Sequence, residues 1–273
     1  MVKSLKKLNE ICQKPHYKKV GNWMVRHILR PAALPMTWLL LHTPITAHQV
    51  TLASIVVGVA GIYCFSLPGK SLFLAGCLLL QFWYYLDHVD GQIARYRGTS
   101  SLTGRFFDYM MHHFIHGIIL FSLGYYLFAT TGHRIFLAWG FAGSVSTFMF
   151  NLIYDAQYKT FFERLAPVKR LEINRPVQGE KGPEQNQEKT SKKKPAAVFF
   201  SLLHKSYEIH VIMNILTLAA FLQAWFSNVP DLRPALFAFY GLAAPLLAVT
   251  KISYWIRSQK VDREFESNFR VLE

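Results

Sequence analysis

Three acidic side chains and one histidine recur at helical spacing within residues 87–116. Asp87 and Asp90 lie three residues apart, and Asp108 and His112 lie four residues apart, so each pair shares one face of a helix. Ionisable groups inside apolar segments are costly and usually face the protein interior. Carboxylate oxygens and an imidazole nitrogen suit Mg²⁺ or Mn²⁺, so we expect these four side chains to bind one or two divalent cations.

Small residues and arginines accompany this cluster. Gly91 and Ala94 continue the helical face of the first acidic pair, and Gly104 lies one turn before the second pair. Residues this small let a backbone or a ligand approach closely. Arg95 and Arg105 lie nearby, and arginines beside a divalent cation suit a diphosphate group. The stretch therefore predicts a site for a substrate that carries a diphosphate.

The stretch resembles the signature of the CDP-alcohol phosphotransferases, which is D-x-x-D-G-x-x-A-R, eight residues, then G-x-x-x-D-x-x-x-D. Seven of the eight fixed positions match. The matching residues are Asp87, Asp90, Gly91, Ala94, Arg95, Gly104 and Asp108. The eighth position, where the family has its last aspartate, is His112.

The resemblance implies a reaction, its cofactors and its partners. A substituted phosphate moves from a CDP-alcohol to an acceptor alcohol, CMP is released, and the enzyme is a homodimer. A CDP-linked lipid such as CDP-diacylglycerol is the expected donor, in phospholipid biosynthesis. The implied metal ligands are Asp87, Asp90, Asp108 and His112. The implied nucleotide-binding residues are Asp90, Gly91, Ala94, Arg95 and Gly104.

His112 occupies the position of the aspartate that, in the family, deprotonates the acceptor alcohol. An imidazole has an ordinary pKa near ~6.5 and can accept such a proton at cytosolic pH. We therefore expect His112 to act as base, as metal ligand, or as both in turn. Two alternatives stay open: activity has been lost while nucleotide binding remains, or the reaction passes through a phosphohistidine.

Further residues are assigned on weaker grounds. The segment TPITAHQVT resembles the entry to the family's first helix, T-P-N-x-L-T, with His48 in place of the Asn and Thr51 matching the Thr. Thr51 is thus expected at the nucleotide, although it could serve only as a helix-start residue. Arg105, His116 and Lys159 are expected to bind the acceptor. Arg105 could equally extend towards the headgroups, and topogenic charge would explain Lys159.

The composition indicates a membrane protein. Of 273 residues, 52% are hydrophobic and 17% are charged, which is less charge than a soluble domain of this length carries. The net charge of +14 is expected to lie in cytoplasmic loops and against anionic lipid headgroups. No motif that reads DNA or single-stranded RNA is visible, so we expect no nucleic-acid partner.

Six apolar segments are each near the ~20 residues that a ~30 Å hydrocarbon core requires. The sequence therefore predicts an all-α membrane protein with six transmembrane helices, preceded by an N-terminal interfacial amphipathic helix. That first helix would present Trp23, Met24, Ile28 and Leu29 to the lipid. The predicted spans are Thr46–Leu67, about Leu72 to past Asp90, Gly104–Thr130, Ile135–Tyr154, Ile209–Phe226 and Pro234–Ile256.

The chain divides into three expected parts. Residues 1–45 form an N-terminal cytoplasmic or interfacial segment, residues 46–256 the catalytic transmembrane domain, and residues 257–273 a tail. Within the domain, residues 157–205 are expected to form a mobile loop, because its central part is poor in apolar residues. Of thirty Lys and Arg residues, only Lys70, Arg134 and Arg233 fall on one side of the predicted spans. The positive-inside rule then places both termini and the motif in the cytoplasm, in a bacterial or archaeal inner membrane.

Two rival functions belong to other classes. A catalytically silent protein of the same fold would bind the nucleotide without releasing CMP. A transporter would line a path with its acidic residues, but these cluster at the predicted cytoplasmic mouth. The sequence leaves the acceptor open among glycerol phosphate, inositol phosphate, serine and another lipid.

Overall fold

Five long apolar helices dominate the structure, a computed structural model that describes residues 3–13, 22–173, 202, 203 and 205–272. Each is long and apolar enough to cross a membrane. They are α3 (Ala47–Ser66), α4 (Lys70–Arg97), α5 (Leu102–Thr131), α6 (Ile135–Leu165) and α10 (Arg233–Arg257). The chain is therefore an integral membrane protein, and the predicted all-α class is confirmed apart from one short pair of β-strands.

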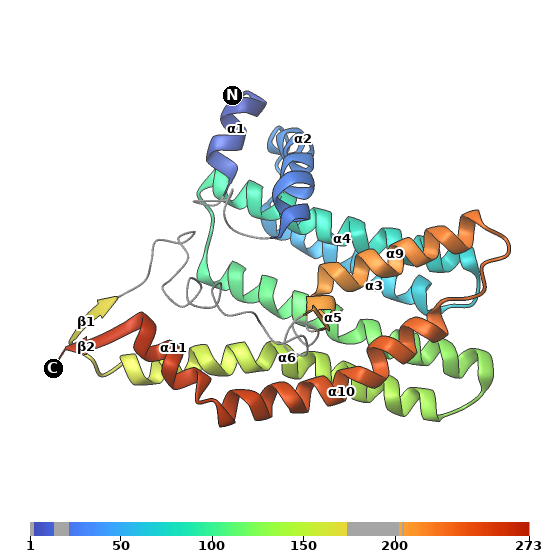
Figure 1. The fold of residues 1–273 in the computed structure, drawn as a ribbon. Coiled ribbons are helices and arrows are strands. Elements are labelled where there is room, and N and C mark those ends of the chain that lie inside the picture. The colour runs from blue at the N-terminus through green and yellow to red at the C-terminus, as the bar shows by residue number, and fades with distance from the viewer. Residues whose placement is uncertain (1–2, 14–21, 174–201, 204, 273) are drawn as a thin grey trace.

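The remaining predicted span is α9 (Ile209–Trp225), an apolar helix of 17 residues. At ~1.5 Å per residue it is about 26 Å long, slightly less than a ~30 Å hydrocarbon core. It packs along α4 (Figure 1). Gln81 Nε2 on α4 donates to Asn214 Oδ1 and to Thr217 Oγ1 on α9, at 3.0 Å each. Hydrogen bonds between helices are common where the surroundings are apolar. These two bonds join α9 to α4.

Local sequence signals set the end of α4 and the start of α5, the two helices that carry the motif. Ser101 Oγ accepts a hydrogen bond from the Gly104 backbone at 3.0 Å and caps the start of α5. Gly98 ends α4 with φ +65°, a conformation that glycine adopts without strain. The four residues between α4 and α5 therefore form a tight turn. This turn brings the motif-bearing ends of the two helices together.

Glycines bring neighbouring helices into close contact. A Cβ atom on Gly76 of α4 would lie 2.7 Å from the Gly61 carbonyl oxygen of α3. A Cβ atom on Gly124 of α5 would lie 2.8 Å from the Gly140 Cα of α6. Small residues at such contacts are typical of helix pairs in membranes. These glycines allow α4 to lie close to α3, and α5 to lie close to α6.

A buried arginine joins the opposite ends of four helices. Arg233, 2% exposed, begins α10 and pairs with Asp231 at 2.8 Å. Its Nη1 donates to the Leu67 carbonyl at 2.7 Å, and its guanidinium carbon lies 3.4 Å from the centre of the Tyr126 ring. A buried arginine is tolerated when it is paired and hydrogen-bonded in this way. The contact connects α10 to α5 and to the turn between α3 and α4.

The N-terminal segment is more broken than predicted. It contains α1 (Leu5–Cys12), a π-helical turn η1 (Val25–Leu29) and α2 (Arg30–Leu41), which cover one end of α4 (Figure 1). The predicted lipid-facing stripe is divided, because Trp23 and Ile28 are exposed whereas Leu29 is buried in the core. Helix α2 has 12 residues, which is too short to span a ~30 Å hydrocarbon core.

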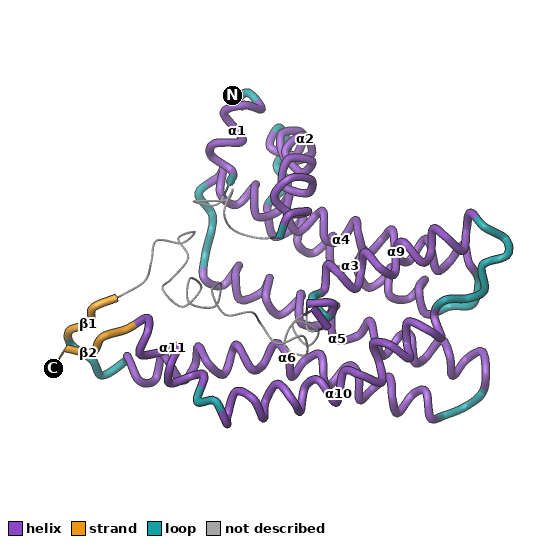
Figure 2. The backbone as a smooth tube through the Cα atoms, viewed as in Figure 1, coloured by secondary structure: helices purple, strands orange, loops and turns teal. Residues whose placement is uncertain are grey.

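Residues beyond the long helices are more ordered than predicted. Residues 157–165, assigned to the loop by the sequence, are the last turns of α6. The predicted tail contains α11 (Lys260–Asn268) and β2 (Phe269–Leu272). Strand β2 pairs antiparallel with β1 (Arg170–Ile173), as Figure 2 shows. Phe161 of α6, Phe265 of α11 and Phe269 of β2 pack together. Most of the predicted mobile loop, residues 174–201, lies outside the described residues.

Candidate active site

Three side chains of the motif converge between α4 and α5. His112 Nε2 on α5 lies 3.0 Å from Asp87 Oδ1 on α4 and 3.3 Å from Asp108 Oδ1 on its own helix. One ligand atom from each of the three residues lies within 4.8 Å of the others. The two helical faces expected from the sequence therefore meet at these residues.

Aromatic rings support the histidine from the α4 side. The Trp83 ring centre lies 5.2 Å from that of His112, and the Tyr84 ring meets it edge-on at 6.3 Å. Both aromatic residues are buried, so their packing restrains the imidazole. His88 also approaches the cluster, with Nδ1 3.6 Å from Asp87 Oδ2. Neither His88 nor Trp83 was predicted at the site, although both lie within four residues of Asp87.

The three converging side chains form a donor set that fits a divalent cation. Ligands of Mg²⁺ lie ~2.1 Å from the metal, so two of them are at most ~4.2 Å apart. The observed limit of 4.8 Å needs only a small inward movement of the side chains. Two carboxylates and a neutral imidazole also match the ligand preferences of Mg²⁺ and Mn²⁺. Asp87, Asp108 and His112 can therefore hold such an ion.

Asp90 lies outside this group of three. Its Oδ2 accepts a hydrogen bond of 2.6 Å from Thr51 Oγ1 on α3. Thr51 and Asp90, both expected at the nucleotide, are thus in contact. The assignment of Asp90 as a metal ligand stays a prediction.

The other residues expected at the nucleotide lie at the same end of α3, α4 and α5. The Arg95 guanidinium lies across Gly91, where an added Cβ atom would be 3.2 Å from Nη1. Arg95 Nε donates to the backbone carbonyl of Cys12 in α1. The Ala94 carbonyl accepts from the Thr99 backbone at 2.9 Å, within the turn that ends α4.

Gly104 begins the face of α5 that carries the acidic residues. A Cβ atom on Gly104 would lie 3.7 Å from His48 Cε1 of α3. His48 occupies the position where the family entry segment has an Asn. The start of α5 therefore faces the start of α3, beside the Thr51 and Asp90 contact.

The family model of the CDP-alcohol phosphatidyltransferases matches residues 44–171. The resemblance of the motif to this family is therefore confirmed. This range begins just before α3 and ends within β1, so it contains the three converging side chains. CDP-alcohol phosphatidyltransferase activity in general is supported by this match, as is a divalent metal. A comparison with curated proteins found no match.

The residues expected to bind the acceptor alcohol are not brought together. Arg105 is exposed on the first turn of α5, and Lys159 is 76% exposed and lies 3.8 Å from Glu163. His116 is buried, and its Nε2 has no hydrogen-bond partner within the described residues. In that part of the chain no hydrogen bond joins His116 to His112. Their acceptor roles stay predictions.

Other ionisable groups on α5, α6 and α10 already have partners. His113 Nε2 lies 3.1 Å from Asp155 Oδ2, which joins α5 to α6. Arg164 lies over the Phe265 ring at 4.8 Å, and Lys251 lies over the Tyr154 ring at 4.4 Å. An acidic acceptor would have to displace these contacts to use the charges.

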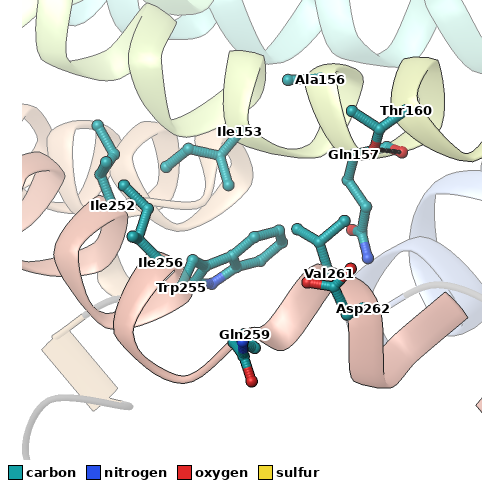
Figure 3. A pocket seen from close by; sticks show the side chains of 10 residues that line it. All are labelled: Ile153, Ala156, Gln157, Thr160, Ile252, Trp255, Ile256, Gln259, Val261 and Asp262. Carbon is teal, nitrogen blue, oxygen red and sulfur yellow. Dashed lines mark hydrogen bonds between the residues drawn. The ribbon is translucent and has the colours of Figure 1, made fainter. Parts of the chain in front are cut away.

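A cavity of about 400 Å³ lies apart from the motif. It is formed by α6, α10 and α11, with Ile153 and Trp255 among its apolar lining residues and Gln157 at its edge (Figure 3). None of its lining residues belongs to the motif. The site described above is therefore defined by the convergence of side chains rather than by this cavity.

Proposed function

We propose that this protein transfers a substituted phosphate from a CDP-linked lipid, such as CDP-diacylglycerol, to an acceptor alcohol and releases CMP. One observation carries the proposal. Asp87, Asp108 and His112 converge within 4.8 Å, inside the range that matches the family. Such a set suits the chemistry of a diphosphate ester, whose negative charge must be neutralised before bond exchange.

Asp87, Asp108 and His112 would hold the divalent cation, either Mg²⁺ or Mn²⁺, and Asp90 would join them if a second ion binds. When bound, the cation supplies charge neutralisation on the diphosphate and stabilises the CMP leaving group. The support is the chemistry of the donor set and its spacing.

Residues on α3 and α4 bind and orient the donor. Thr51 holds the Asp90 carboxylate, and Arg95 extends its guanidinium over the open backbone of Gly91. A guanidinium is planar and always charged, so it binds phosphate oxygens with defined geometry. Donor binding and positioning supply a large part of the catalysis in this proposal.

The chemical step exchanges one phosphorus–oxygen bond for another. The acceptor hydroxyl oxygen attacks the phosphorus that carries the lipid alcohol, and the bond from that phosphorus to the CMP oxygen breaks. His112 takes the hydroxyl proton. A neutral imidazole has a single lone-pair nitrogen, so His112 binds the metal or takes the proton in turn and does not do both at once. The acceptor stays open among glycerol phosphate, inositol phosphate, serine and another lipid.

The proposed cellular setting follows from charge. The basic termini and the motif lie in the cytoplasm, and the protein is a homodimer in a bacterial or archaeal inner membrane, where it serves phospholipid biosynthesis. The distribution of Lys and Arg supports the orientation. Family resemblance supports the dimer.

The test uses purified protein with CDP-diacylglycerol, Mg²⁺ and a panel of alcohols, with CMP as the readout. The proposal expects CMP release that depends on one class of alcohol. CDP binding without CMP release would identify a catalytically silent nucleotide-binding protein. Solute flux in liposomes without nucleotide chemistry would identify a transporter.

A further inference from the structure

Helix α1 crosses the end of α4 that carries the motif, and hydrogen bonds join the two helices at both ends of α1. Before the helix, the Lys3 backbone N–H donates to the Tyr96 hydroxyl at 3.2 Å. At the other end, the Cys12 carbonyl accepts from Arg95 Nε. These contacts link residues 93 and 83 positions apart in the sequence. Helix α1 therefore contacts Arg95, which is expected to bind the nucleotide.

Burial holds α1 in this place. Leu8 and Cys12 have no exposed surface and share a core cluster with Ala33, Val89 and Ile93. An isolated helix of eight residues is not stable in water, so α1 forms because it docks on α2 and α4. Burial also raises the pKa of the Cys12 thiol, although Arg95 opposes this, so the thiol is a neutral packing group.

The end of α1 suits a guanidinium group. Cys12 is the last residue of the helix, and its carbonyl is among those that have no partner inside the helix. The carbonyls at a helix C-terminus also carry partial negative charge, which favours a cation. Arg95 supplies both the hydrogen bond and the charge that this carbonyl requires.

The hydrogen bond to the Cys12 carbonyl restrains the Arg95 side chain but leaves Nη1 and Nη2 able to bind a ligand. Only Nε is bonded to Cys12, and Nη1 and Nη2 make no hydrogen bond within the described part of the chain. The guanidinium lies across Gly91, within electrostatic range of Asp87 and Asp90. An unrestrained arginine would lose rotamer freedom on binding a phosphate, whereas a restrained one has already lost it.

We propose that α1 is a positioning element for the donor, and that it holds Arg95 so that Nη1 and Nη2 bind the diphosphate of a nucleoside diphosphate ester. The inference rests on the proposed function and adds to it an N-terminal helix that acts through Arg95. Helix α1 itself touches no reacting atom.

The test compares two leucines of α1. Leu8→Ser undocks the helix, and Leu5→Ser is the matched control, because Leu5 is 46% exposed. We expect Leu8→Ser to raise the KM for CDP-diacylglycerol and the Kd for CDP by about tenfold, which corresponds to the cost of ordering one long side chain on binding. The kcat should change by less than about threefold. Leu5→Ser should match the unaltered protein in all three constants.

A double-mutant cycle separates positioning from general stability. Arg95→Lys removes the Nε donor, so adding Leu8→Ser to it should raise the Kd for CDP no further. An unchanged Kd in Leu8→Ser would overturn the inference, and so would a full additional increase on the Arg95→Lys background. Failure of the proposed function appears differently, as CDP binding by the unaltered protein without CMP release. The Kd comparison still tests the role of α1 in that case.

Discussion

Replacing His112 with alanine removes the group that lies between two carboxylates. Its Nε2 is 3.0 Å from Asp87 Oδ1 and 3.3 Å from Asp108 Oδ1, and the three ligand atoms lie within 4.8 Å. Two unit charges about 4.8 Å apart repel by on the order of 3 kcal/mol at an effective dielectric constant of about 20. Asp108 is 43% exposed, so solvent screening reduces this to about 1–2 kcal/mol.

This repulsion predicts a metal-dependent loss of stability. Without a divalent cation, His112→Ala should unfold about 3–6 °C below the unaltered protein. Excess Mg²⁺ should restore much of the difference, because a cation between the carboxylates replaces the imidazole. The neighbouring variant His113→Ala is the matched control, since His113 contacts Asp155 on α6 instead.

Activity should fall further than stability. A general base contributes ~10²–10⁴-fold to the rate, so CMP release by His112→Ala should fall by about that factor. This corresponds to a barrier higher by about 3–5 kcal/mol. The Kd for CDP should stay within about threefold of the unaltered value. His112→Asp, which restores a carboxylate base, should retain measurable CMP release.

The assay combines CMP release from CDP-diacylglycerol at saturating Mg²⁺, calorimetric binding of CDP, and thermal unfolding in EDTA or Mg²⁺. Full turnover by His112→Ala would refute the assignment of the base. A melting temperature of His112→Ala equal to that of the unaltered protein in EDTA would refute the electrostatic reasoning.

Further predictions concern the metal, the donor and the opposite end of the helices. EDTA should stop CMP release and Mg²⁺ or Mn²⁺ should restore it, and Asp108→Asn should raise the Mg²⁺ concentration that gives half-maximal rate. Thr51→Val removes the hydroxyl that holds the Asp90 carboxylate and should raise the KM for the donor by about three- to tenfold. Arg233→Met should lower the free energy of unfolding by about 3 kcal/mol or more, whereas the exposed Arg257→Met should change it by less than about 0.5 kcal/mol, as measured by denaturation. Burial raises the pKa of Asp231, but hydrogen bonds from Arg233 and Tyr126 outweigh it and lower the pKa to about 2. The stabilisation is therefore full above the unfolded pKa of ~3.9 and is lost as the pH falls towards 2, so Asp231→Asn should flatten acid unfolding in that window.

Local rules were sufficient for the positions of the helices. The long spans follow from runs of apolar residues, and their ends follow from residues such as Ser101 and Gly98, whose effects act within one turn. The spacing of Asp108 and His112 likewise placed both on one face of α5, because four residues make about one helical turn. The sequence therefore determined the fold class and the location of the site.

Contacts between helices decided which motif residues meet. Asp87 and Asp90 are three residues apart, which rotates their side chains by about 60° relative to each other on a helix of ~3.6 residues per turn. That difference allows Asp87 to face His112 while Asp90 faces Thr51. The sequence placed both carboxylates at the site, but only the packing of α3 and α5 against α4 assigned them different neighbours.

The contact between α1 and Arg95 had no signature in the sequence. The acceptor is the Cys12 carbonyl, a backbone atom that every residue possesses, and it lies 83 positions away from its donor. Side-chain patterns report which surfaces are apolar and which groups ionise. They do not report which free carbonyl at a helix end will meet a given guanidinium, because that depends on where two distant helices dock.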